Sequence, residues 1–269
     1  MPPPTARPTA GRTAAFAPIP PDAAGMPLYR AVKRSLLAAV ESSRFRPGDA
    51  LPSESELAAA FEVAIGTVRK AVDELVAEHV VVRRQGRGTF VATHDAGRLM
   101  FQFFHVERSD GLREIPSVEL IQFGRGRATD EAAQALALRP GEPVIEIENA
   151  LRLQGRAVIH DRLVLPAGLY RGLSEKRIGE RPGTMYQFYQ AEFGITVLRA
   201  HERARAVGAD RAAARVLGVA SGTPVMELRR TALTFNDRPV EYRVSIVDTA
   251  RHDYVNVLSR PAGAVSAGG

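Results

Sequence analysis

The side chains best suited to chemistry are hydroxyl and basic groups gathered between residues 67 and 87. The group consists of Thr67, Arg69, Lys70, Arg83, Arg84 and Arg87. Guanidinium and ammonium groups bind phosphates, and Arg, Lys and Thr side chains also bond the edges of bases in the grooves of a duplex. Such contacts make and break no covalent bond. The cluster therefore predicts noncovalent recognition of double-stranded DNA.

No comparable cluster suits catalysis or metal binding. The chain has no Cys, which removes a thiol nucleophile, a disulfide framework and Cys-based metal sites. Its scattered His160, His201 and His252 lack metal-ligand spacing. No nucleophile stands beside a visible base, and no GxxxxGKS/T phosphate loop occurs. We therefore expect no catalytic residue, no metal and no cofactor, and we expect that the protein is not an enzyme.

Two short helices must position the first part of the basic group. Ser53 followed by Glu56 forms a capping box, so a helix is expected to start at Ser53. Residues 62–64 leave room only for a tight turn before a second helix that runs to about residue 79. A supporting helix is expected over residues 28–43. The second helix, whose polar side is free to face a groove, has its apolar positions at Val68, Ala71, Val72, Leu75 and Val76.

A basic hairpin follows the second helix. Residues 80–84 are typical of a strand, residues 85–88 of a turn, and residues 89–91 of a returning strand. Gly86 and Gly88 allow a positive φ and a close approach to a phosphate or a minor-groove wall. The alternative is a solvated basic hairpin without a partner. The succession of two helices and this hairpin favours a winged helix-turn-helix instead.

The motifs LPSESELA, TVRKAVDEL and RRQGRGTFVA span much of residues 27–92. They resemble the amino-terminal domain of GntR-type bacterial transcription regulators. The resemblance implies a recognition helix in the major groove, a wing tip in the adjacent minor groove, and two copies on a short palindrome. Family members often carry Arg in place of Ser55 and Ile65 and a polar cap in place of Ala64, so a different operator is expected. By position, the DNA-binding residues are Ser53, Glu54, Thr67, Arg69, Lys70, Arg83, Arg84, Gly86 and Arg87.

The composition is that of an ordinary two-domain protein. The 269 residues are 45% hydrophobic and 25% charged, with a net charge of +6. No apolar run approaches the roughly 18 residues of a membrane span, so no membrane-spanning segment is expected. The resemblance to GntR-type regulators implies a bacterial cytoplasmic protein associated with the nucleoid. Residues 1–25 are rich in Pro and poor in large apolar side chains, so a disordered tail is expected rather than a transit peptide. Residues 259–269 are expected to form a flexible tail.

An internal repeat follows a small, polar segment at residues 93–98 that suits a linker or hinge. Residues 131–158 and 211–240 share an Ala-rich helix, a Gly-x-Pro-Val step and two strands around a polar turn. Neither copy can cover its own apolar strand faces. We therefore expect one antiparallel sheet built from both copies, with helices packed on it and a pocket between the copies.

The order of elements from about residue 99 to 258 resembles UTRA, the effector-binding domain of the HutC-like branch of GntR regulators. The resemblance implies an α+β protein whose second domain, after the winged helix of residues 26–92, has an antiparallel-sheet fold like chorismate lyase and binds a small metabolite. Ala150 stands where the family has the first Arg of an Arg-x-Arg clamp, and Val247 where sugar-phosphate-binding members have Tyr, so a carboxylate or another small polar effector is expected. By position, the effector-binding residues are Arg152, Asp161, Arg162, Thr184, Tyr186 and Glu241.

Each of these assignments has a structural alternative. The charged strand residues could pair across the sheet surface, Thr184 could serve as a helix N-cap, and Tyr186 could belong to the core. For the whole protein, the alternatives are an enzyme of chorismate-lyase-like fold fused to a DNA-binding domain, and a DNA-binding protein that needs no ligand. We expect a homodimeric transcription regulator, by resemblance a repressor, whose affinity for a palindromic operator a small metabolite controls.

Overall fold

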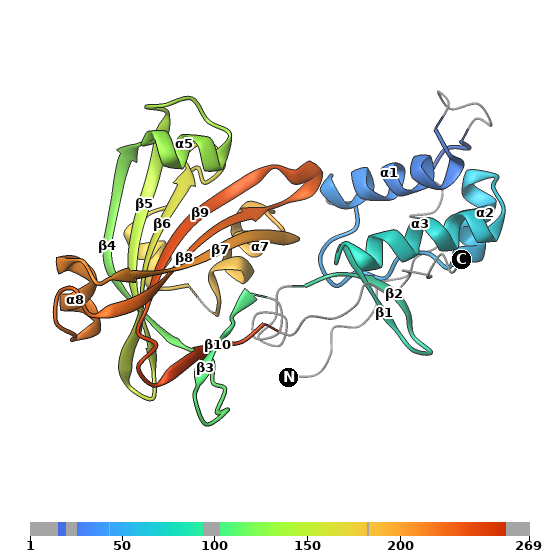
Figure 1. Ribbon diagram of the computed structural model, residues 1–269. Helices are drawn as coiled ribbons and strands as arrows, with labels where there is room; N and C mark the ends of the chain where they lie inside the picture. The colour runs from blue at the N-terminus through green and yellow to red at the C-terminus, as the bar shows by residue number, and fades with distance from the viewer. Residues whose placement is uncertain (1–15, 20–25, 43, 94–102, 182, 257–269) are drawn as a thin grey trace, which may run out of the picture. The chain divides into compact units, whose positions relative to one another are not determined.

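The computed structural model describes residues 16–19, 26–42, 44–93, 103–181 and 183–256 (Figure 1). The chain divides into two compact units, with the boundary between Thr93 and His94. The predicted hinge at residues 93–98 lies outside the described residues apart from Thr93, and so does the predicted tail at 259–269. No helix in the described ranges is long and apolar enough to cross a membrane.

The first unit is a three-helix group followed by a two-stranded antiparallel hairpin. Its elements are α1 (Leu28–Glu41), α2 (Glu54–Phe61), α3 (Ile65–Ala77), β1 (Val81–Arg84) and β2 (Gly88–Val91). Helical spacing brings Leu36, Leu57, Phe61 and Leu75 into one buried core between the helices. The expected helix-turn-helix and hairpin are confirmed.

The two helices of the helix-turn-helix begin differently. Ser53 caps α2 with the expected capping box: its hydroxyl accepts from Glu56 N at 3.2 Å, and Ser53 N donates to the Glu56 carboxylate at 2.7 Å. Ala64 precedes α3 and offers no side-chain cap. The first N–H groups of α3 therefore lack the partner that a Ser or Asp would provide.

The expectation of a wholly disordered tail over residues 1–25 needs one correction. Phe16 is buried and packs on Phe61 and Phe45, with ring centroids 4.8 Å and 6.0 Å away. Ile19 N donates to Phe61 O at 3.1 Å. A single aromatic ring gains enough from burial to hold a short proline-rich segment against the helices, although the segment has no core of its own.

The second unit is built on one six-stranded antiparallel sheet in the order β4-β5-β6-β9-β8-β7. A short pair, β3 with β10, lies apart from it. The strands are β3 (Val106–Arg108), β4 (Ser117–Arg127), β5 (Pro143–Leu153), β6 (Arg156–Pro166), β7 (Arg199–Gly208), β8 (Pro224–Leu233), β9 (Pro239–Val247) and β10 (His252–Tyr254). The helices are α5 (Asp130–Leu136), α6 (Glu175–Gly179), α7 (Met185–Phe193), α8 (Arg211–Leu217) and the short η3 (Phe235–Asp237).

The predicted repeat is present and extends one strand further than the sequence indicated. Each copy is strand, helix, strand, strand: β4-α5-β5-β6 and β7-α8-β8-β9. Ala128 and Ala209 occupy equivalent places, and their amides donate to Glu142 O at 2.9 Å and Thr223 O at 2.8 Å. The inner strands β6 and β9 pair with each other and join the copies at the centre of the sheet.

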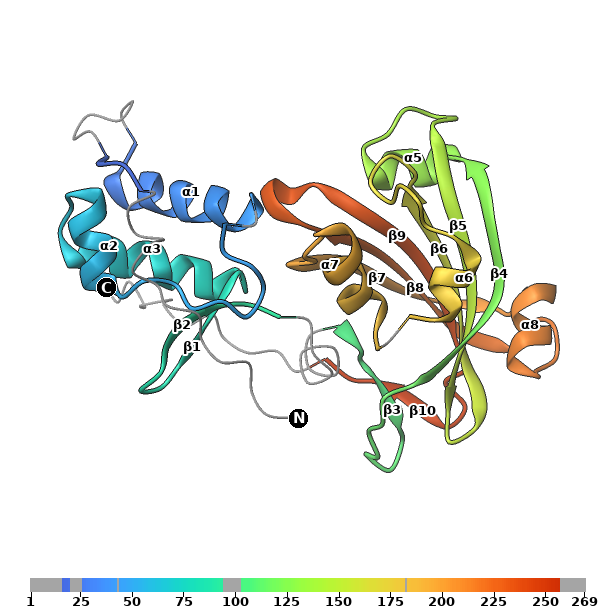
Figure 2. The same ribbon diagram turned by 180° about the vertical axis from the view of Figure 1, so that it is seen from behind.

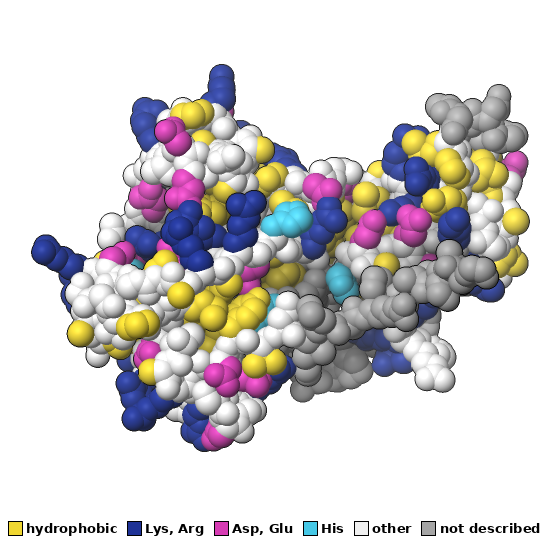
Figure 3. All heavy atoms as spheres, in the orientation of Figure 1, with side chains coloured by type: hydrophobic (Ala, Val, Ile, Leu, Met, Phe, Trp, Pro, Cys, Tyr) yellow, Lys and Arg dark blue, Asp and Glu magenta, His cyan; other side chains and the backbone are white. Residues whose placement is uncertain are grey.

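The two faces of the sheet have different coverings. Helices α5 and α8 pack on one face, against Tyr242 of β9 and Ile246 of β9 respectively (Figure 1). Helix α7 lies over the other face, where Tyr186 and Tyr189 join a core with Ile147 and Leu163 (Figure 2). On the α5 and α8 face, Lys and Arg side chains gather over β7 and β8 (Figure 3). The α7 face differs from it in carrying an aromatic core against the sheet.

Candidate DNA-binding and effector sites

The recognition surface of the first unit is organised around one carboxylate. Glu54, at the start of α2, accepts from Arg69 Nε of α3 at 2.9 Å and from the guanidinium of Arg83 in β1 at 2.9 Å. Arg83 also contacts Asp73 of α3. Arg69 is exposed, with 62% of its side-chain surface open. Glu54 therefore ties three elements together and holds two guanidinium groups at the surface.

The remaining predicted DNA contacts have distinct surroundings. Lys70 is exposed and lies over the ring of Tyr29, 4.1 Å from its centroid. Arg84 lies over the ring of Phe90 at 5.0 Å, and Arg87 is exposed at the turn of the hairpin. Thr67 is half-buried on α3, and the Ser53 hydroxyl is engaged by its capping box. One cation of the wing, Arg84, and one of α3, Lys70, thus lie against aromatic rings.

The turn of the wing needs glycine. Gly86 and Gly88 have φ values of +68° and +109°, and nothing lies within 4 Å of where a Cβ would stand at either position. The tip is therefore narrow and open, as an approach to a DNA groove requires.

The second unit encloses a cavity of about 360 Å³ between the two copies of the repeat, where a pocket was expected. Strands of both copies form its floor. One row of cross-strand neighbours crosses four strands, and its members are Asn149, Asp161, Ser245 and Leu228. The start of α7 and the segment before it form the opposite wall, with Arg181, Thr184, Met185 and Tyr186.

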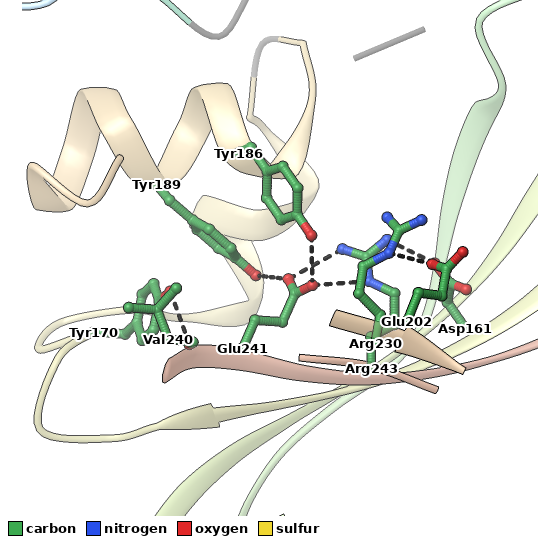
Figure 4. A network of polar contacts seen from close by, with 9 residues as sticks. All are labelled: Asp161, Tyr170, Tyr186, Tyr189, Glu202, Arg230, Val240, Glu241 and Arg243. Atoms are coloured by element: carbon green, nitrogen blue, oxygen red, sulfur yellow. Dashed lines mark hydrogen bonds and ion pairs between the residues drawn. The ribbon is translucent and has the colours of Figure 1, made fainter. Parts of the chain in front are cut away.

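A buried carboxylate anchors one side of this cavity. Glu241 of β9 is fully buried, and it accepts from Tyr186 at 3.2 Å and from Tyr189 at 2.7 Å (Figure 4). Arg243 donates to Glu241 at 2.9 Å and to Asp161 at 3.0 Å. Burial, with Glu241 beside it, raises the pKa of Tyr186 to about 12. Both tyrosines therefore stay protonated and keep donating to Glu241 at neutral pH.

A second pair lies on the neighbouring strands. Arg230 of β8 donates to Glu202 of β7, and the Tyr254 hydroxyl of β10 contacts the same carboxylate. Burial disfavours the charge on Glu202, but Arg230 and Tyr254 outweigh burial and lower its pKa. Arg230 is thus a neutralised cation at the cavity wall.

Three polar atoms at the cavity have no hydrogen-bond partner among the described residues. They are Asn149 Oδ1, Asp161 Oδ1 and Arg181 Nε. Asn149 and Asp161 are each 1% exposed. Burial, followed by the charge of Arg243, lowers the pKa of Arg181. Unpaired buried polar groups are rare in folded proteins, so these atoms mark where a bound molecule would make contacts.

The structure brings together four of the six predicted effector residues. Asp161, Thr184 and Tyr186 line the cavity, and Glu241 supports it through Tyr186. Thr184 also serves as the N-cap of α7, accepting from Gln187 N at 3.2 Å. The two readings of Thr184 as a cap and as a site residue are therefore compatible.

Neither of the predicted effector residues Arg152 and Arg162 lines the cavity. Arg162 follows Asp161 on a strand, so it points to the opposite face, where it is half exposed and 3.9 Å from Asp210. Arg152 alternates with the cavity residues Asn149 and Leu151 along β5, so it also points to the opposite face, where it binds Glu119 on the edge strand at 2.9 Å.

The cations of the site are residues that the sequence reasoning missed. They are Arg181, Arg230 and Arg243, and the same row holds the overlooked Asn149. One signal was available: Arg230 and Arg243 interrupt the apolar strands MELRRTAL and VEYRVSIV at inward positions. Within the described ranges, no group of His, Cys, Asp and Glu is arranged to hold a metal ion.

Comparison with known proteins assigns each of the two units to a known domain family. Residues 28–91 match the model for bacterial regulatory proteins of the gntR family, and residues 112–253 match the UTRA domain. The transcriptional repressor NagR of Bacillus subtilis is 25% identical over 238 residues, 87% of this chain and 96% of NagR. The repressor PhnF of Mycolicibacterium smegmatis is 29% identical over 220 residues, 82% of this chain and 88% of PhnF.

A solved structure covers the second unit. The ligand-binding domain of a GntR-family regulator from Bordetella bronchiseptica is similar with 31% identity and a TM-score of 0.55, over 59% of this chain and 99% of that domain. The winged helix and the enclosed pocket together define a DNA-binding transcription regulator with an effector domain. The chain belongs to the gntR family of bacterial regulatory proteins, among the members that carry a UTRA domain.

Proposed function

We propose that this regulator is a homodimeric repressor whose affinity for a palindromic operator changes when a small polar metabolite occupies the cavity of the second unit. The observation that carries the proposal is the presence, in one chain, of an exposed recognition helix and an enclosed cavity with unpaired buried polar atoms. The names of NagR and PhnF support repression. Such a repressor would be located in the bacterial nucleoid, where the chromosomal DNA lies.

On the DNA, α3 enters the major groove and the hairpin tip reaches the minor groove. Arg69 and Thr67 of α3 are placed to meet base edges, while Arg84 and Arg87 of the hairpin meet phosphates. A two-fold dimer presents two such units to the two halves of a palindrome. The segment at residues 93–98 couples the units, so that ligand binding changes the spacing of the two winged helices.

The free energy required is modest. A hundredfold change in operator occupancy needs a ligand that prefers one arrangement over the other by about 2.7 kcal/mol. A few hydrogen bonds made to the ligand in only one of the two arrangements provide that difference.

Fluorescence anisotropy of labelled promoter DNA from upstream of the protein's own coding sequence, at two salt concentrations, tests the proposal. We expect salt-dependent binding that one compound in a panel of carboxylates, amino acids and sugar phosphates alters. Replacing Arg84 and Arg87 with Gln should weaken binding to all duplexes and lower the salt slope by about two. Arg139→Gln, on the fully solvated tip beside α5, is the control. Absence of DNA binding would refute the proposal.

A further inference from the structure

The acceptor end of the cavity is built from two neighbouring strands. Asn149 of β5 and Asp161 of β6 are direct cross-strand partners, each 1% exposed. Asp161 Oδ2 accepts from Arg243 at 3.0 Å, whereas Asp161 Oδ1 and Asn149 Oδ1 have no partner in the described part of the chain. Since buried acceptors are ordinarily paired, the missing partner must bring N–H or O–H donors to this place. A carboxylate oxygen favours a donor that carries positive charge.

The opposite wall offers the complementary chemistry. Arg181 precedes α7 and lines the cavity, its Nε has no partner, and no described carboxylate contacts it. One of its other nitrogens donates to Ile178 O. Thr184 and Met185 begin α7 at the same wall, so the positive end of the helix dipole lies there too. This end suits an anionic group.

The charges at the cavity leave nothing to balance a multiply charged anion. Arg230 is matched by Glu202, and Arg243 is shared by Glu241 and Asp161, so Arg181 is the cation without a carboxylate in the described ranges. A phosphate monoester would bring a charge of about −1.5 to −2, and Arg181 would balance only about one unit of it. A molecule with one positive and one negative group would match both ends.

Resting on the proposed function, we propose that the effector is a zwitterionic amino acid with an apolar side chain. Its ammonium group binds Asp161 Oδ1 and Asn149 Oδ1, and its carboxylate binds Arg181 beside the N-terminal end of α7. Apolar walls receive its side chain, and they include Phe103, Val106, Leu151, Ile159 and Leu228. A cavity of about 360 Å³ lies at the small end of the range for small-molecule sites, which suits a compact ligand.

Isothermal titration of the full chain tests the inference with leucine, isoleucine, methionine, phenylalanine and tyrosine. Each amino acid is compared with its deaminated acid and with its decarboxylated amine, and glucose 6-phosphate, which has no ammonium group, serves as the dianionic comparison. We expect at least one amino acid to bind and both of its analogues to bind about ten- to a hundredfold more weakly, since each loses charge-assisted hydrogen bonds.

Two variants test which end of the cavity binds the ammonium group and which binds the carboxylate. Asp161→Asn should weaken binding of the amino acid by about ten- to a hundredfold and leave binding of the deaminated acid unchanged. Arg181→Gln should weaken binding of the amino acid and leave binding of the amine unchanged. The adjacent Arg162→Gln, on the opposite face, is the matched control. Asn149→Leu removes an unpaired buried amide oxygen, so it should raise the melting temperature of the ligand-free chain. The same substitution should weaken binding of the amino acid. That opposite pair of effects separates a ligand contact from a structural role.

The inference is overturned if no amino acid binds, if the deaminated acid binds as tightly as its parent, or if only the sugar phosphate binds. Operator binding by the unliganded chain is measured on the same samples. Intact operator binding with any of those three results refutes the zwitterion alone. Lost operator binding refutes the proposed function.

Discussion

At the scale of single residues, Glu54 is a carboxylate in a surface that meets phosphates. It lies between Arg69 and Arg83 and hydrogen-bonds both at 2.9 Å. Such a group repels the DNA backbone, yet it also fixes where two guanidinium groups point. Recognition of a particular base depends on the second effect, because bidentate contacts require a defined orientation. We therefore expect Glu54 to contribute to discrimination at a cost in overall affinity.

Glu54→Gln should strengthen binding to non-operator DNA and lower the ratio of operator to non-operator affinity by about tenfold, the loss of one oriented base contact. Anisotropy titrations with the operator and a scrambled duplex at one salt concentration measure both quantities. Glu62→Gln, an exposed carboxylate at the end of α2, serves as the control. An unchanged ratio would show that Glu54 has no part in orienting the two arginines.

At the scale of elements, the recognition helix α3 lacks a side-chain N-cap. Ala64 has the extended backbone of an N-cap, with φ −62° and ψ 144°, but no side-chain hydrogen bond reaches the first turn of α3. By contrast, Ser53, Thr129, Thr184 and Asp210 each cap their helices. Helix α3 therefore depends on packing of Val68, Ala71 and Leu75 rather than on its own end.

Ala64→Ser should stabilise the first unit by about 1 kcal/mol, because the hydroxyl accepts from an N–H of the first turn. Urea unfolding followed by circular dichroism measures the change. Ala59→Ser, at an exposed position inside α2, is the control and should be slightly destabilising, since Ser is a poorer helix former than Ala. Equal stability of the two variants would mean that α3 gains nothing from a cap.

At the scale of the whole molecule, control of DNA binding is a coupling free energy between two units. Thermodynamic linkage makes that coupling reciprocal: a compound that changes operator affinity by some factor must have its own affinity changed by the same factor. The coupling does not depend on which element transmits it.

Titration of any binding compound into the chain, with and without saturating operator duplex, should therefore give one ratio of dissociation constants for each of the two sites of the proposed dimer. The product of the two ratios should equal the ratio measured for the operator. A scrambled duplex at the same concentration controls for bulk electrostatic effects. A compound that fills the cavity and shifts operator affinity without the matching reverse shift would have to act at a different site.

Local signals in the sequence determined the first unit and the plan of the second. The Ser53 capping box, the apolar spacing of α3 and the glycines of the wing each act within a few residues. They can therefore be predicted from the sequence without knowledge of the tertiary structure. The 81-residue offset between Leu136 and Leu217 likewise predicted two equivalent units sharing one sheet. These features depend on neighbours in the chain.

Only the tertiary structure decided which side chains form the effector site. Successive side chains of a strand point to opposite faces, so Asp161 enters the cavity while Arg162 and, on β5, Arg152 point away from it. Which of the two faces carries the cavity is decided by the packing of α7 on the sheet. Arg243 meets Asp161 across 82 positions of sequence. Contacts of that separation follow from strand order and register, which the spacing of residues along the chain does not specify.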